Sequence, residues 1–174
     1  IDHMVAEGEK VGLIKVRLYR PFVAAKLAEA IPATCTKIAV LDRTKEPGAL
    51  GEPLYLDVVA ALAQAGVTGK TVVGGRYGLG SKDTPPSSIF AVYEELSKDA
   101  PTHNFTLGIN DDVTHLSLPL EKEINVAGDK ASQLIFFGLG SDGTVGANKS
   151  TIKLIGDNTD YYAQAYFAYD SKKS

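Results

Sequence analysis

The sequence has few of the residues that build metal centres and disulfides. It contains one cysteine, three histidines and no tryptophan among 174 residues. The single Cys35 cannot close an internal disulfide, which favours a reducing compartment, and an iron–sulfur cluster needs about four such ligands. His3, His103 and His115 lack the spacing of metal ligands. We therefore expect a cytoplasmic chain that holds no metal by itself.

Excess charge and long apolar runs are also missing. The formal net charge is −3 and no segment is dense in Lys and Arg, so the sequence predicts no binding to nucleic acid. The longest apolar stretches, such as 134–137, are far too short to span a bilayer. Residues 1–10 lack the basic and apolar regions of a secretory signal, and we interpret them as a vector-derived start followed by a leader.

What is present is an alternation of strand-like and helix-like segments. Apolar and β-branched runs predict strands, and apolar positions at helical spacing, bounded by Pro or Gly, predict helices between them. The expected order is strand 11–18, helix 22–31, strand 37–41, helix 53–66, strand 71–73, helix 86–100 and strand 104–109. This order predicts an α/β domain over 11–120, with a mostly parallel sheet and helices on both of its faces.

The pattern then breaks and starts again. Residues 121–130 are interpreted as a linker, preceded by a short edge strand around Leu116 and Leu118. A strand at 133–137, a helix at 143–155 and a strand at 162–169 follow. One βαβ unit cannot cover its own sheet faces. We therefore expect 131–174 to be the truncated start of a second α/β domain.

The most specific motif is Gly138-Leu139-Gly140-Ser141-Asp142-Gly143, which matches G-x-G-x-x-G between the predicted strand and helix. In such a turn the glycines allow a tight bend and close approach of a phosphate, which the free N–H groups of the helix bind. The candidate cofactor-binding residues are Gly138, Gly140, Ser141, Gly143, Thr144, Asn148 and Lys149. A turn without any ligand remains an alternative, because Asp142 places a negative charge where phosphate would bind.

A dinucleotide site would also need an acid about 20 residues after the glycines. Asp170 follows the last predicted strand, a little later than this spacing requires. A solvated chain end explains Asp170 equally well.

Two further segments follow predicted strands. In 74–82, Arg76 and Lys82 could hold an anion or a facing carboxylate, although we favour a structural or interdomain loop. In 42–49, an internal turn formed by Asp42, Arg43 and Glu46, or a contact with a neighbouring domain, is the simplest interpretation. The sequence shows neither a G-x-S-x-G motif nor an acid–base constellation, so we assign no catalytic residue.

Several long strings of this sequence together resemble one enzyme family. They run in order from about residue 11 to the end of the chain and are more specific than a glycine pattern. They are Val16-Arg17-Leu18-Tyr19-Arg20-Pro21-Phe22, Leu41-Asp42-Arg43-Thr44-Lys45-Glu46-Pro47-Gly48, Tyr55-Leu56-Asp57-Val58, Gly74-Gly75-Arg76-Tyr77-Gly78-Leu79, Asp111-Asp112-Val113-Thr114, Leu116-Ser117-Leu118-Pro119, the glycine turn at 138–143 and Tyr166-Phe167-Ala168-Tyr169-Asp170-Ser171-Lys172-Lys173.

These strings resemble pyruvate:ferredoxin (flavodoxin) oxidoreductase, and the resemblance implies an internal piece of a large enzyme. That enzyme decarboxylates pyruvate on thiamine diphosphate with magnesium, passes electrons through iron–sulfur clusters to ferredoxin or flavodoxin, and forms acetyl-CoA. Residues 11–120 would be its second domain, similar to the C-terminal domain of transketolases, and 131–174 would begin a third domain associated with coenzyme A. The parent would be a homodimer whose cofactors lie in other domains, so the chain alone is expected to carry no cofactor and no activity.

Two other functions stay open at this point. The glycine turn could serve an autonomous dinucleotide-binding domain. Alternatively, the chain could be a noncatalytic assembly module whose glycines serve only packing. Arg20, which precedes Pro21 at the end of a predicted strand, is expected to contact a neighbouring domain or subunit.

Overall fold

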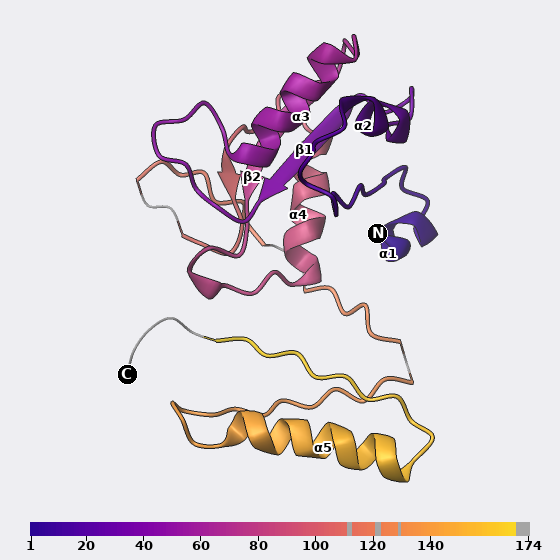
Figure 1. Cartoon of the computed structure of the whole chain (residues 1–174), viewed down its shortest axis with the longest axis vertical. Helices are drawn as coiled ribbons and strands as arrows, with labels where there is room; N and C mark the ends of the chain where they lie inside the picture. Colours follow the sequence, from indigo (N-terminus) through magenta and orange to yellow (C-terminus); the bar gives the residue numbers. More distant parts are fainter. Residues whose placement is uncertain (111–112, 121–122, 129, 170–174) are drawn as a thin grey trace. The chain divides into compact units, whose positions relative to one another are not determined.

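The computed structural model describes residues 1–110, 113–120, 123–128 and 130–169. The chain divides into two compact units, Ile1–Val126 and Ala127–Ser174. Each unit is described by itself below (Figure 1). None of the helices in the described ranges combines the length and hydrophobicity needed to cross a bilayer.

The first unit contains a parallel sheet of three strands in the order β1-β2-β3. The strands are β1 (Lys37–Asp42), β2 (Thr71–Arg76) and β3 (Phe105–Thr106). β1 and β2 pair along their full length, from Lys37 opposite Thr71 to Asp42 opposite Arg76, and β2 pairs with β3 at Gly75 and Phe105. The predicted α/β class with a parallel sheet is confirmed.

The helices of this unit begin where the sequence places helix-compatible prolines. α3 (Pro53–Gln64) and α4 (Pro86–Ser97) both start at a proline, whose missing N–H costs nothing in the first turn. The shorter elements are α1 (Asp2–Ala6), α2 (Ala24–Ala30) and the 3₁₀ turn η1 (Leu79–Ser81). Residues 1–10 thus contain a helix, and its Met4 is buried.

Helices cover both faces of the sheet, as the sequence predicted. Neighbouring residues of β1 point to opposite faces. On one face Val40 packs with Val58 and Leu62 of α3, and α2 contributes Leu27. On the other face, side chains from β1, β2, α4 and the segment after β3 pack around the fully buried Phe105. These side chains are Ala39, Leu41, Val73, Val92, Leu96 and Leu107.

The predicted first strand, 11–18, is not formed. This segment has no ladder partner. Its contacts are with helices instead: the hydroxyl of Tyr93 in α4 donates to the carbonyl of Gly12, and just beyond it Arg20 pairs with Asp57 of α3 at 2.8 Å. A β-branched sequence favours an extended backbone, but only pairing makes a strand.

Two other strands predicted in this unit are shorter than expected. The strand expected at 104–109 is Phe105–Thr106 only. The edge strand expected around Leu116 and Leu118 is a single parallel bridge between Thr106 and Ser117. The Thr106 N–H donates to Leu116 and its carbonyl accepts from Leu118, so both leucines do flank the sheet edge.

The second unit consists of α5 (Thr144–Asn158) and extended segments before and after it. The predicted helix is confirmed, but the predicted strands at 133–137 and 162–169 are wrong, since neither has a ladder partner in the described residues. No described residue of this unit is buried. Its apolar side chains, among them Ile135 and Phe137 at 93% and 82% exposure, form no core of their own.

Candidate functional site: the glycine turn of α5 and the strand-end network

Each glycine of the motif is required by the local geometry of the turn. Gly140 and Gly143 have φ values of 63° and 86°, in the left-handed region that only glycine adopts without strain. A Cβ on Gly138 would lie 2.7 Å from the Cβ of Thr144, so any larger residue would displace the first helical residue. The motif is therefore explained by the turn itself, with or without a ligand.

Asp142 accepts hydrogen bonds from two backbone N–H groups of the turn. Its Oδ2 accepts a hydrogen bond from the N–H of Leu139 at 3.0 Å, and its Oδ1 accepts from the N–H and the hydroxyl of Thr144 at 3.0 and 2.6 Å. The hydrogen bond from the Thr144 hydroxyl, followed by those from the backbone, lowers the pKa of Asp142, so the carboxylate stays ionised. A phosphate would have to displace a resident anion.

The other candidate residues lie farther along α5. Gly138, Asp142 and Thr144 meet in the turn, Ser141 is exposed beside them, and Asn148 is half-buried in the second turn of the helix. Exposed Lys149 places its ammonium 5.8 Å from the ring centre of Phe167. Asp170, the acid considered for a dinucleotide ribose, lies outside the described residues.

A dinucleotide site is not favoured by this arrangement. In a dinucleotide site the glycine turn connects a strand to the following helix, and that strand is paired with neighbouring strands in a sheet. Here neither flanking segment has a strand partner among the described residues, and the N–H groups of Leu139 and Thr144 are bonded to Asp142.

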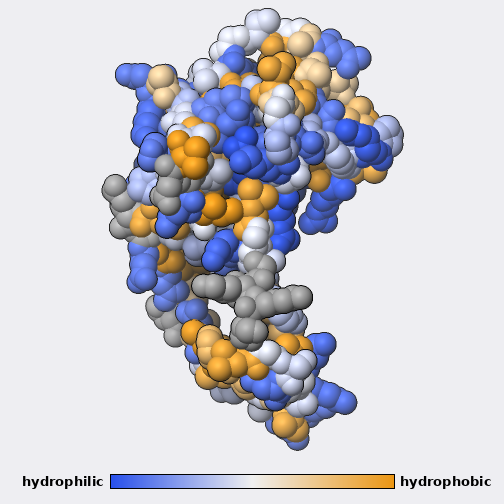
Figure 2. All heavy atoms as spheres, turned by 90° about the vertical axis from the view of Figure 1, so that its left-hand side faces the viewer, coloured by the Kyte–Doolittle hydropathy of each residue, from blue (hydrophilic) through white to orange (hydrophobic). Residues whose placement is uncertain are grey.

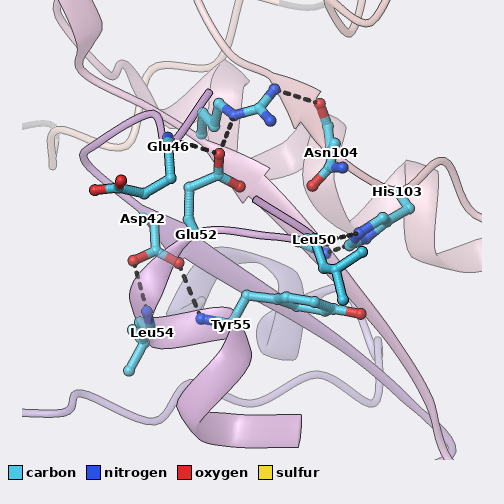
Figure 3. Close-up of polar contacts among 10 residues, drawn as sticks. Asp42, Glu46, Leu50, Glu52, Leu54, Tyr55, His103 and Asn104 are labelled. Carbon is cyan, nitrogen blue, oxygen red and sulfur yellow. Dashed lines mark hydrogen bonds and ion pairs between the residues drawn. The ribbon is translucent and has the colours of Figure 1, made fainter. Parts of the chain in front are cut away.

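A second group of polar residues gathers at the carboxyl ends of β1 and β2 (Figure 3). Arg76, the last residue of β2, donates from Nε to Oε1 of Glu52 at 2.6 Å, and from Nη1 to the carbonyl of Asn104 at 3.0 Å. The side chains of Arg76 and Glu52 are 11% and 1% exposed. Of the two partners that the sequence left open for Arg76, an anion or a facing carboxylate, the structure shows the carboxylate.

Asp42, the last residue of β1, caps α3. Its two carboxylate oxygens accept from the N–H groups of Leu54 and Tyr55 at 2.9 and 3.0 Å, which satisfies orphan donors of the first helical turn. The prediction that Asp42, Arg43 and Glu46 bond to one another in an internal turn is therefore wrong. Arg43 donates to the carbonyl of Gly78 at 3.5 Å instead.

Sequence reasoning missed His103, which it tested only as a metal ligand. Its Nδ1 accepts from the N–H of Gly74 at 3.0 Å, and its ring lies against Tyr55 with centroids 4.6 Å apart. The ring nitrogen takes the place of a strand carbonyl beside β2. No local signal identifies this role, because His103 and Gly74 are 29 residues apart.

The strand-end network is structural in its chemistry. Both carboxylate oxygens of Asp42 accept from backbone N–H groups, and Glu52 accepts from Arg76 through Oε1, as Figure 3 shows. The buried Glu52 Oε2 and Asn104 Oδ1 have no hydrogen-bond partner among the described residues. In the described ranges, no group of three His, Cys, Asp or Glu side chains could hold a metal ion. The network fixes loop 43–52 over the strand ends and joins β1, β2 and α3 in one rigid corner.

The chain was compared with known proteins. A family model described as "Pyruvate:ferredoxin oxidoreductase core domain II" matches residues 1–89. The "Pyruvate:ferredoxin oxidoreductase" of Moorella thermoacetica is 58% identical over 174 residues, which is 100% of this chain and 15% of the relative. The "Pyruvate-flavodoxin oxidoreductase" of Trichormus variabilis is 56% identical, and the "Probable pyruvate-flavodoxin oxidoreductase" of Escherichia coli is 53% identical, again over 100% of this chain and 15% of the relative.

These matches confirm the resemblance expected from the sequence strings. The chain spans about 15% of the length of the curated relatives it matches. The family model covers more than half of the 174 residues. The chain belongs to the pyruvate:ferredoxin oxidoreductase family.

Proposed function

We propose that this chain is an internal part of an enzyme that oxidatively decarboxylates pyruvate to acetyl-CoA and passes the electrons to ferredoxin or flavodoxin. Identity of 53–58% over the whole of this chain to relatives named for this activity carries the proposal. Because the chain covers 15% of those relatives, we assign it a share of the enzyme and not the whole reaction.

We assign this share to assembly of the enzyme. The acids and bases at the strand ends of the first unit are engaged in bonds that hold the fold. The one cysteine of the chain cannot ligate an iron–sulfur cluster alone. Thiamine diphosphate, which would supply the decarboxylation chemistry, and the clusters are therefore assigned to other parts of the longer protein.

For the second unit we propose a contribution to the coenzyme A site. Lys149 offers the phosphates of coenzyme A a cation from the second turn of α5, whereas the N–H groups of Leu139 and Thr144 are bonded to Asp142. Within the candidate residues, Lys149 is thus the phosphate contact, and Gly138, Gly140 and Gly143 shape the turn that starts its helix.

The test is a steady-state assay of the longer protein that contains this chain, with pyruvate, coenzyme A and ferredoxin or flavodoxin. We expect pyruvate oxidation to depend on coenzyme A, and the 174-residue chain alone to show no turnover. A longer protein that leaves pyruvate unchanged but oxidises another substrate would contradict the proposed activity.

Lys149→Ala tests the coenzyme A contact. We expect the KM for coenzyme A to rise by about tenfold, equivalent to about 1.4 kcal/mol, with the KM for pyruvate unchanged. Lys153→Ala, which removes another exposed lysine from the same helix, is the matched control. Equal effects of the two substitutions would show that only the general positive charge matters.

A further inference from the structure

α3 carries apolar residues on two opposite sides. The inner side packs in the core through Val58, Ala61 and Leu62, which are buried. The outer side carries apolar residues at the spacing i, i+3, i+4 and i+7, which places them along one face of a helix. This outer stripe consists of Leu56, Val59, Ala60 and Ala63, all of them exposed, with Leu56 at 40% and Val59 at 38%.

The outer stripe is more apolar than the solvent-facing side of a typical surface helix. A helix at a protein surface normally turns charged and polar residues outward, and α4 does so with Glu94 and Ser97. α3 contains one charged residue, Asp57, and that carboxylate is paired with Arg20 at 2.8 Å. Figure 2 shows orange, apolar side chains among blue ones at the upper end of the first unit, the height at which both α2 and α3 lie in Figure 1.

We propose that the outer stripe of α3 is an interface for an uncharged, apolar helix from another part of the same longer polypeptide. The proposal rests on the proposed function, in which this chain is 15% of the enzyme. The alanines of the stripe leave room for a second helix to pack closely, and the stripe offers no charge for a charged partner to pair with.

A second copy of this chain fits the stripe less well. A stable interface between separate proteins needs about 20–30 residues a side, and the stripe supplies four. A partner in the same polypeptide needs far fewer contacts, because the covalent link raises its effective concentration. The small size of the stripe therefore favours a partner in the same chain.

The experiment measures the reactivity of a thiol placed in the stripe. Val59→Cys is made in the 174-residue chain and in the longer protein, and maleimide labelling at position 59 is followed by peptide mass mapping, which separates it from Cys35. We expect labelling to be at least about tenfold slower in the longer protein. Ser97→Cys on the outer side of α4 is the matched control and should react at similar rates in both proteins.

Equal reactivity of Val59→Cys in the two proteins would overturn the proposal, and so would protection that disappears on dilution, which indicates a second copy. Ala60→Cys serves as a second probe of the same stripe if Val59→Cys reduces folding. A longer protein that oxidises pyruvate but leaves both thiols reactive defeats this inference alone. One that protects the thiols without oxidising pyruvate contradicts the proposed activity alone.

Discussion

Glu52 and Arg76 show how one pair of residues holds the strand-end corner together. The carboxylate is almost completely buried, and its Oε1 accepts from Arg76 at 2.6 Å and from the N–H of Glu46 at 3.4 Å. A buried ion pair adds little net stability when it is complete, but removing one partner leaves an uncompensated charge. The complete pair therefore holds loop 43–52 in position and adds little to the free energy of unfolding.

Glu52→Ala tests this argument. It leaves the Arg76 guanidinium buried without its carboxylate, and we expect a loss of about 3–5 kcal/mol in the free energy of unfolding. Urea denaturation of the 174-residue chain measures it. Lys26→Ala is the control, because it breaks the exposed pair of Lys26 with Glu29 and should cost less than about 1 kcal/mol. Similar losses in both variants would contradict the role given to Glu52.

Glu95 gives the first unit an acid-sensitive contact. Burial raises the pKa of this carboxyl, but hydrogen bonds from Lys98 at 2.6 Å and from the Thr102 N–H at 2.7 Å outweigh burial and leave the pKa below the ordinary 4.5. The folded state therefore prefers the ionised form. Its contribution to stability is complete above about pH 4.5 and is lost as the pH falls through the lowered pKa of the folded state.

Glu95→Gln should remove this pH dependence. We expect the difference in unfolding free energy between the wild type and the variant to be constant near neutral pH and to shrink below pH 4.5. Urea titrations at a series of pH values measure that difference. Glu29→Gln, which changes an exposed carboxylate, is the matched control. An acid slope that is identical in the wild type and Glu95→Gln would refute the assignment.

At the scale of elements, β2 depends on glycines for contact with β3. Gly75 lies opposite Phe105 in the sheet, and a Cβ on Gly75 would overlap the Phe105 ring, which is fully buried. The ring covers the strand where a side chain would normally stand. The two-residue strand β3 is thereby fixed by an aromatic contact as well as by its ladder bonds.

Gly75→Ala should disturb that contact. Because the Cβ would overlap the fully buried Phe105 ring, we expect a loss of about 1–3 kcal/mol in unfolding free energy. Thermal and urea denaturation measure the loss. Gly12→Ala is the matched control, since a Cβ on Gly12 would meet no atom within 4 Å and should be nearly neutral. A neutral Gly75→Ala would mean that the ring does not occupy this position.

At the scale of the whole molecule, the two units differ in how they are stabilised. The first unit has two apolar clusters, one on each face of its sheet. The second unit has no buried residue among those described, so its helix α5 depends on local bonds such as the hydrogen bond from the Thr144 N–H to Asp142. A helix of about 12–15 residues is marginal in water without tertiary packing.

Hydrogen exchange should separate the two units in the 174-residue chain. We expect the amides of β1 and β2 to exchange far more slowly than those of α5, because only the former lie in a packed core. Exchange followed by peptide mass spectrometry measures this. In the longer protein, α5 should gain protection while β1 and β2 change little. Equal protection of α5 and β2 in the 174-residue chain would show that the second unit is stable alone.

Local sequence determined the helices and the class of the fold. Pro53 and Pro86 start α3 and α4 at the predicted places, and the glycine motif forms a turn in which Gly140 and Gly143 have a left-handed backbone. These features depend on the conformational preferences of single residues and on apolar spacing, both of which are readable from neighbours in the chain. The strings that resemble the family were likewise local, and the comparisons confirmed them.

Only the tertiary structure decided which extended segments become strands and which polar residues meet. The segments 11–18, 133–137 and 162–169 have strand-like composition, but a strand exists only where another backbone supplies hydrogen bonds. Arg76 is hydrogen-bonded to Glu52, 24 residues away in the sequence, and Gly74 is hydrogen-bonded to His103, 29 residues away. Pairings of this kind depend on how distant parts of the chain come together, which neither composition nor spacing encodes.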